Sequence, residues 1–231
     1  MILRKLEERR LPRDLIYLAW IESGFLPTVE SHAGAVGLWQ FMPETARWLG
    51  LRVDAVVDER RDPVKSTDAA LTFLSGLYRR YGSWHLAMAA YNGGPTRVSR
   101  IVRQHARGPW GHESLYWQVL EYLPTETAHY VPRLLAVRSL ATERFREAPR
   151  FVPDAPYEYD VVWVSRPLTF TELSRLSGLS VEELRELNPH LVAERIPRGL
   201  EPHPLRVPVG TATRVAGTLV RPRPAFAQAD D

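Results

Sequence analysis

The 231-residue chain contains no cysteine, which excludes disulfide bonds, thiolate metal sites and cysteine nucleophiles. It has no run of 18 apolar residues, so the sequence predicts no membrane-spanning helix. Basic residues outnumber acidic residues by only 30 to 27, and this small surplus does not indicate a nucleic-acid partner. With 45% hydrophobic and 25% charged residues, the composition is typical of a globular protein.

The N-terminus also lacks the pattern of a secretory signal. Residues 1–10 are charged and have a helical pattern, without an apolar segment followed by a cleavage site. We therefore expect either a cytoplasmic protein or a fragment, or mis-assigned start, whose targeting segment is absent. Seven histidines are present without paired metal-ligand spacing, so we expect no metal site and no cofactor.

Helical patterns fill residues 1–145. The stretch from Asp14 to Ile21 is apolar almost all round, which is typical of a buried helix, and Gly24 is a suitable residue to end it. Asp62-Pro63 has the pattern of a helix start, with an N-cap followed by proline at the first helical position. The sequence predicts further helices over 1–10, 43–49, 63–81 and 84–91, after Pro95 and from Thr125.

The remainder of the chain has a different pattern. Two β-rich segments flank two short helices, each of which begins with a capping box. The strands are expected at 161–164 and 205–209, and the capping boxes at Thr169–Glu172 and Ser180–Glu183. We predict a linker over 146–157, a strand-helix-helix-strand (βααβ) module over 158–210 and a tail over 211–231.

Glu22 is a candidate general acid. It shares one face of the apolar helix with Leu15 and Leu18, at positions i, i+3 and i+7, which predicts partial desolvation of its carboxyl group. It also lies at the negative end of the helix dipole, and both effects raise a carboxyl pKa. Periodicity alone favours the alternative, a glutamate at a helix end that points into solvent.

Two further segments combine glycines with aromatic and amide side chains. Gly34–Pro43 contains glycines, two aromatic residues, an amide and a methionine, which would suit a sugar-binding groove. Ala89–Gly94 contains a tyrosine and an asparagine beside two glycines. Neither segment alone indicates a binding site, because aromatic residues at helix ends usually lie in the core and Asn-Gly pairs usually form turns.

Together these segments resemble the soluble-lytic-transglycosylase domain of the goose-type-lysozyme-like superfamily. The resemblance is carried by Glu22–Pro27, Gly37–Pro43 and Ala90–Gly93, in the order and spacing of that family. Asp58–Thr67 and Pro124–Val131 indicate the membrane-bound lytic transglycosylase D branch. The resemblance implies a mainly α fold: a lysozyme-like helical catalytic domain over 1–145, followed by the small βααβ module.

The βααβ module resembles a degenerate LysM module. Leu184–Pro189 matches the LysM pattern, but Ser165-Arg166-Pro167 stands where a Gly-Asp pair usually follows the first strand. Glycan binding by this module is therefore left open.

The resemblance implies cleavage of the β-1,4 bond between N-acetylmuramic acid (MurNAc) and N-acetylglucosamine (GlcNAc) in peptidoglycan. The reaction is non-hydrolytic, produces 1,6-anhydroMurNAc ends and uses Glu22 as the single acid/base. Ser23 would support the acid, and Tyr91 would orient it or stabilise charge at the reacting ring. The residues implied in substrate binding are Ser31, Gln40, Met42, Tyr91, Asn92, Glu126 and Tyr130. The implied partner is the peptidoglycan glycan strand, the implied location is the periplasm or cell envelope, and we expect a monomer.

Two alternatives remain at this stage. A goose-type muramidase would use water and a second carboxylate, but none stands inside the core motifs, and Glu30 and Glu44 have the pattern of surface residues. A non-catalytic wall-binding scaffold would not need Glu22, Gln40 and Tyr91 together.

Overall fold

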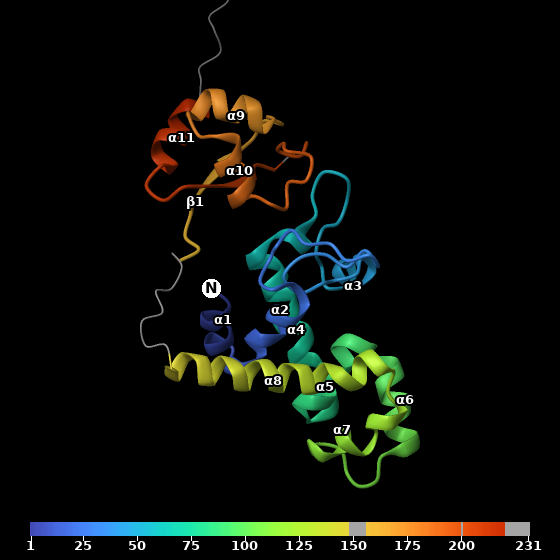
Figure 1. Cartoon of the computed structure of the whole chain (residues 1–231). Coiled ribbons are helices and arrows are strands. Elements are labelled where there is room, and N and C mark those ends of the chain that lie inside the picture. The colour runs from blue at the N-terminus through green and yellow to red at the C-terminus, as the bar shows by residue number, and fades with distance from the viewer. Residues whose placement is uncertain (148–155, 200, 220–231) are drawn as a thin grey trace, which may run out of the picture. The chain divides into compact units, whose positions relative to one another are not determined.

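The computed structural model describes residues 1–147, 156–199 and 201–219. The chain divides into two compact units. Unit 1 contains Met1–Arg52 and Glu59–Ala155, and unit 2 contains Val53–Asp58 and Pro156–Asp231. The predicted mainly α architecture with a small two-stranded sheet is confirmed (Figure 1). The predicted linker at 146–157 lies mostly outside the described residues.

Unit 1 is helical. Its elements are α1 (Ile2–Glu8), η1 (Arg13–Leu15), α2 (Ile16–Ser23), α3 (Pro43–Trp48), η2 (Glu59–Arg61), α4 (Pro63–Tyr81), α5 (Trp84–Gly93), α6 (Pro95–His105), α7 (Ser114–Gln118), η3 (Leu120–Tyr122) and α8 (Thr125–Glu147). Local sequence sets several helix starts, since the Asp62 carboxylate caps α4 by accepting from Val64 N and Lys65 N, both at 2.9 Å. Helix α7 was not predicted.

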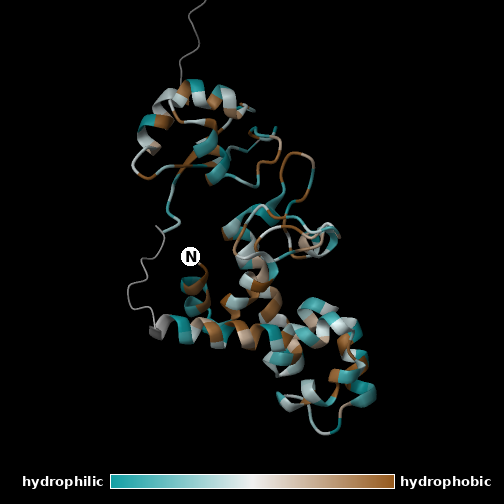
Figure 2. Cartoon of the chain, viewed as in Figure 1, coloured by the Kyte–Doolittle hydropathy of each residue, from teal (hydrophilic) through white to brown (hydrophobic). Residues whose placement is uncertain are grey.

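Helix α5 is the centre of unit 1 and packs against α4, α6, α7 and α8. Its residues Leu86–Ala90 are all buried, and three of these five are alanines, which allow neighbouring helices to approach closely. Helix α2 packs against α8, and brown ribbon on α2 and on the neighbouring part of α8 marks this apolar contact (Figure 2). These contacts bring the end of α2, the end of α5 and the first turns of α8 together.

A glycine permits the close approach of α5 and α8. A Cβ atom added to Gly93 would lie 2.6 Å from the Thr127 hydroxyl oxygen, closer than two such atoms can approach. Any side chain at this position would therefore push the start of α8 away from the end of α5.

Unit 2 is built around two antiparallel strands, β1 (Asp160–Val164) and β2 (His203–Val207), paired from Asp160 with Val207 to Val164 with His203. Helices α9 (Phe170–Ser177) and α10 (Val181–Leu187) each begin with the predicted capping box. Asn188 ties the end of α10 to β2, because its side chain donates to Arg206 O and accepts from Arg206 N, both at 2.8 Å.

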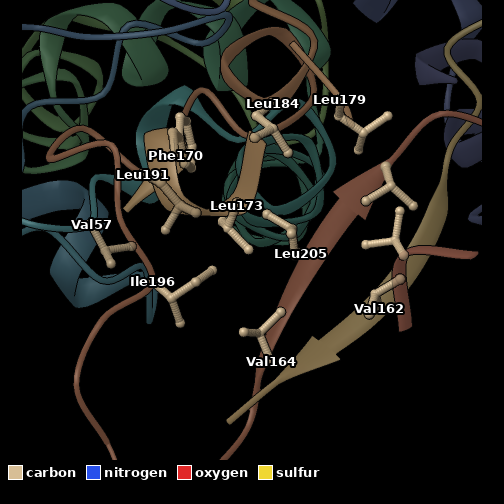
Figure 3. Packing of buried hydrophobic residues seen from close by; sticks show 12 residues of the cluster. Val57, Val162, Val164, Phe170, Leu173, Leu179, Leu184, Leu191, Ile196 and Leu205 are labelled. Carbon is tan, nitrogen blue, oxygen red and sulfur yellow. The ribbon is translucent and has the colours of Figure 1, made fainter. Parts of the chain in front are cut away.

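The core of unit 2 contains side chains from both strands and from the helices, together with Val57 of the 53–58 segment (Figure 3). Helix α11 (Ala212–Leu219) also contributes, with Val215 fully buried. The prediction of a tail from residue 211 was therefore wrong over this helix, because its apolar residues pack against α9 and β1. Strand β2 begins and ends two residues earlier than predicted.

Candidate active site

Glu22 lies in the last turn of α2. The helix is capped by Gly24, whose φ of 61° is left-handed and whose N–H donates to Trp20 O at 2.8 Å. Leu15 and Leu18, on the same face as Glu22, are buried. The Glu22 side chain is itself half-buried, and its Oε1 accepts a hydrogen bond of 2.5 Å from the Tyr130 hydroxyl of α8. Glu22 therefore does not point freely into solvent.

The environment of Glu22 favours its protonated form. The pKa of the carboxyl group is raised from an ordinary value of 4.5 to about 7, chiefly by burial and to a smaller extent by the charge of Glu126. The hydrogen bond from Tyr130 and the charge of Arg133 act in the opposite direction and lower this pKa. A carboxyl group with a pKa near 7 can both donate and accept a proton at neutral pH.

Two tyrosines flank Glu22. Tyr130 is buried and donates to the carboxylate, whereas the Tyr91 hydroxyl of α5 donates to the backbone carbonyl of Trp39 at 2.7 Å. Burial raises the pKa of both phenols well above the ordinary value, and the charge of Glu22 adds to this effect. Both hydroxyls therefore stay protonated, and it is Tyr130, not Tyr91, that is hydrogen-bonded to the Glu22 carboxyl group.

The Gly34–Pro43 segment forms a folded loop. Gly37 has a φ of 85°, and a Cβ added there would lie 2.0 Å from the Arg60 carbonyl oxygen, so the position requires glycine. Gln40 has a left-handed φ of 47°, and its side-chain amide donates to Gly37 O at 3.0 Å and Val29 O at 3.3 Å. The N–H groups of Gln40 therefore hold the loop, which leaves its amide oxygen as the end that can meet a ligand.

Serine hydroxyls connect this loop to its surroundings. Ser23 Oγ lies 3.0 Å from the carbonyl oxygens of both Ala19 and Leu38, which joins α2 to the loop. Ser31 Oγ accepts from Ala35 N at 3.0 Å within a turn. Met42 is 40% exposed at the start of α3, where its thioether can contact a ligand.

Asn92, Glu126 and Thr127 form a hydrogen-bonded group where α5 ends and α8 begins. The Asn92 amide donates to Glu126 Oε1 at 3.0 Å, and the Thr127 hydroxyl donates to Asn92 Oδ1 at 2.8 Å. Glu126 is exposed, yet its charge acts on Glu22. The site therefore contains a second carboxylate, which sequence reasoning had assigned only to substrate binding. Glu30, in contrast, pairs with Arg61 at 3.2 Å.

Sequence reasoning missed three contributors to this site. Arg133 lies one turn beyond Tyr130 in α8, and its charge lowers the pKa of Glu22. Its i, i+3 spacing from Tyr130 indicates a place near Glu22 only when the contact between Tyr130 and Glu22 is already known. Thr127 lies inside the Pro124–Val131 motif and could have been noticed there. Phe73 of α4 lies between the rings of Trp48 and Tyr91, at centroid distances of 5.8 and 5.6 Å.

Two family models match the chain. Residues 2–109 match the model described as the transglycosylase SLT domain, and residues 158–223 match the LysM-like domain of lytic transglycosylase MltD. The predicted resemblance is thereby confirmed in both parts of the chain. Among the described helices, none is long and apolar enough to cross a membrane.

Individual relatives agree with these matches. Membrane-bound lytic murein transglycosylase D of Escherichia coli (strain K12) is 34% identical over 187 residues, which is 80% of this chain and 40% of that protein. Peptidoglycan transglycosylase gp16 of Escherichia phage T7 is 42% identical over 83 residues, which is 35% of this chain and 6% of gp16. The chain thus spans about 40% of the length of the first of these relatives.

Among solved structures, the complex of the 70-kDa soluble lytic transglycosylase with bulgecin A has a TM-score of 0.50 at 22% identity. It covers 66% of this chain, and this chain matches 25% of it. At this identity the similarity concerns the fold alone, and it agrees with the lysozyme-like architecture expected for unit 1.

Proposed function

We propose that this chain cleaves peptidoglycan non-hydrolytically, with Glu22 as its single general acid/base. The chain combines an SLT transglycosylase domain with an MltD-type LysM-like domain and is homologous to membrane-bound lytic murein transglycosylase D. The bond broken is the MurNAc-β-1,4-GlcNAc linkage. The observation that carries the proposal is the half-buried Glu22 carboxyl group, with its pKa raised to about 7 by burial.

The first step is proton donation. Protonated Glu22 delivers its proton to the glycosidic oxygen as the bond from that oxygen to C1 of the muramyl residue breaks. Oε1 is held by Tyr130, while Oε2 accepts no hydrogen bond from any described residue, so Oε2 is the oxygen available for this transfer. The Tyr130 hydrogen bond stabilises the carboxylate that forms.

The second step returns the proton. The Glu22 carboxylate takes the proton of the muramyl C6 hydroxyl as O6 bonds to C1, which closes the 1,6-anhydro ring. Glu22 ends the cycle protonated, as it began, and no water is consumed. A single carboxyl group is sufficient because the nucleophile belongs to the substrate.

One observation favours a second candidate, hydrolysis by a muramidase mechanism. Glu126 is a carboxylate within electrostatic range of Glu22, and hydrolytic glycosidases use such a second group to activate water. Its hydrogen bond from Asn92 instead supports a structural or substrate-binding role.

The whole protein's location in the bacterial envelope and its peptidoglycan partner belong to this proposal, because they rest on the homologue.

Mass spectrometry of digested peptidoglycan separates the candidates. Non-hydrolytic cleavage gives ends that are one water lighter than reducing ends, and these anhydro ends are the expected product. The Glu22→Gln variant is the control and should release neither product. Reducing ends alone, lost in both the Glu22→Gln and Glu126→Gln variants, would establish hydrolysis and overturn the proposal. Full cleavage by the Glu22→Gln variant would remove Glu22 from the mechanism.

A further inference from the structure

Unit 1 has a cavity outside the Glu22 site, between α6 and the segment that precedes α8. Its volume is about 470 Å³. Buried Ile101 and Leu123 give it apolar walls, and the rings of His105 and Tyr122 stack beside them with centroids 3.7 Å apart. Arg97, Arg100 and Gln104 of α6 supply its polar side.

The charge at this cavity is positive. Arg97 and Arg100 lie three residues apart on one face of α6, and both side chains are exposed. Residues 93–112 include four arginines and no acidic residue. Within the described part of the chain, neither Arg97 nor Arg100 is engaged in a salt bridge or a side-chain hydrogen bond. The carboxylate of Glu121, the neighbour of Tyr122 in the chain, raises the pKa of the Tyr122 phenol.

Two arginines and several apolar residues line the same cavity, and this combination fits one chemical class of ligand. Guanidinium donors match a carboxylate in a fixed fork geometry, while apolar and aromatic walls favour aliphatic atoms next to it. A short acidic peptide has both features. A bare inorganic anion would leave the apolar walls unused.

The cavity adjoins the elements of the candidate active site. Asn92 and Glu126 are hydrogen-bonded at 3.0 Å, and the cavity is built from the residues that follow the first and precede the second. Arg97 comes five residues after Asn92, and Pro124 comes two residues before Glu126. The cavity and the Asn92–Glu126 pair are therefore built from the same two chain segments, the one that follows α5 and the one that precedes α8.

We infer that this cavity binds a carboxylate of the acidic peptide stems carried by the glycan strand. The inference rests on the proposed function for the source of the peptide, while the acidic-peptide chemistry rests on the cavity itself. Binding there would position a peptide-bearing strand across the site and would favour substituted over naked glycan.

The first experiment measures binding of a free stem tetrapeptide to the full chain by isothermal titration calorimetry. Arg97→Gln and Arg100→Gln should each weaken binding by about tenfold, since each removes a charge-assisted hydrogen-bond donor. Arg103→Gln is the matched control, because it removes the same charge from the same helix outside the cavity and should bind like the wild type. The same peptide with its carboxylates amidated should bind about tenfold more weakly to the wild type.

Opposite results would overturn the inference: equal binding by all three variants, equal binding of the amidated peptide, or tighter binding of glycerol 3-phosphate than of the peptide.

The second experiment separates this inference from the catalytic proposal. The Glu22→Gln variant should bind the peptide normally while cleaving nothing. Arg97→Gln and Arg100→Gln should lose activity on peptide-bearing strands but cleave strands stripped of peptides at the wild-type rate. Equal loss on both strands would contradict a role in peptide binding.

Discussion

The Tyr130 hydroxyl of α8 donates a 2.5 Å hydrogen bond to Glu22 Oε1 of α2, and the two residues are 108 positions apart in sequence. Because this bond stabilises the charged carboxylate, it holds the pKa of Glu22 lower than burial alone would place it. The tyrosine therefore helps to keep the pKa of Glu22 near neutral pH, where both protonation states of the carboxyl group are populated.

Replacement of Tyr130 by phenylalanine should raise the pKa of Glu22 above its value of about 7. Since the first step needs the protonated acid, the alkaline limb of the kcat/KM profile should move to higher pH, while kcat falls on the order of tenfold. The control is Tyr116→Phe, which removes a buried hydroxyl that donates to Ala128 O rather than to Glu22. An unmoved limb in Tyr130→Phe would contradict this role.

The raised pKa of Glu22 also predicts a pH-dependent cost in stability. Between pH 4.5 and about 7 the folded protein holds a proton that the unfolded chain releases, so the contribution of Glu22 to the free energy of unfolding falls as pH rises. Glu22→Gln should therefore be more stable than the wild type at pH 8, by at most about 3 kcal/mol, and similar to it at pH 4. Urea unfolding of both proteins across this range measures the difference, and a constant difference would contradict the pKa assignment.

The loop that carries Gln40 should depend on Gly37. Gly37→Ala combines a left-handed φ of 85° with a Cβ that collides with the Arg60 carbonyl, whereas Gly34→Ala has a similar φ of 83° and open space. The left-handed backbone alone costs about 1–2 kcal/mol in each, and the collision should add roughly 1–3 kcal/mol in Gly37→Ala. Equal losses of unfolding free energy would show that the loop adapts.

The close approach of α5 and α8 can be tested by a rescue. Gly93→Ala should reduce stability and activity, because its Cβ displaces Thr127 and with it the contact between Asn92 and Glu126. In Thr127→Ala the obstructing Oγ1 and Cγ2 atoms are absent, so the double variant should be more stable than the sum of the single effects. A coupling energy of about 1 kcal/mol is expected from a double-mutant cycle of unfolding. Strict additivity would place the strain elsewhere.

The parts of the fold that could be predicted are those with local causes. The Asp62 cap and the Thr169 and Ser180 capping boxes define helix starts within a few residues of sequence. Helix α11 was missed because its surroundings have the composition of a tail, although its packed residues Ala212, Val215 and Leu219 follow helical spacing.

The candidate site was only partly predictable, for a different reason. Glu22 could be found from its helix, but its partner depends on the rotation of α8 against α2, which is fixed by packing across the unit. For the same reason the contribution of Arg133 to the pKa of Glu22 has no sequence signal. Gln40 was chosen as a sugar contact, and only the folded loop shows that half of its amide is already used.

The 53–58 segment changes where the LysM-like unit can be cut from the chain. A fragment that begins at residue 156 contains both strands and α9 to α11 but lacks Val57, which is only 1% exposed in their shared core. Such a fragment would fold around a missing side chain, with the energetic penalty of a cavity. The C-terminal unit is therefore discontinuous in sequence. An insertion or deletion at residues 53–58 would disturb the packing of a core whose other members lie more than 100 residues further along the chain.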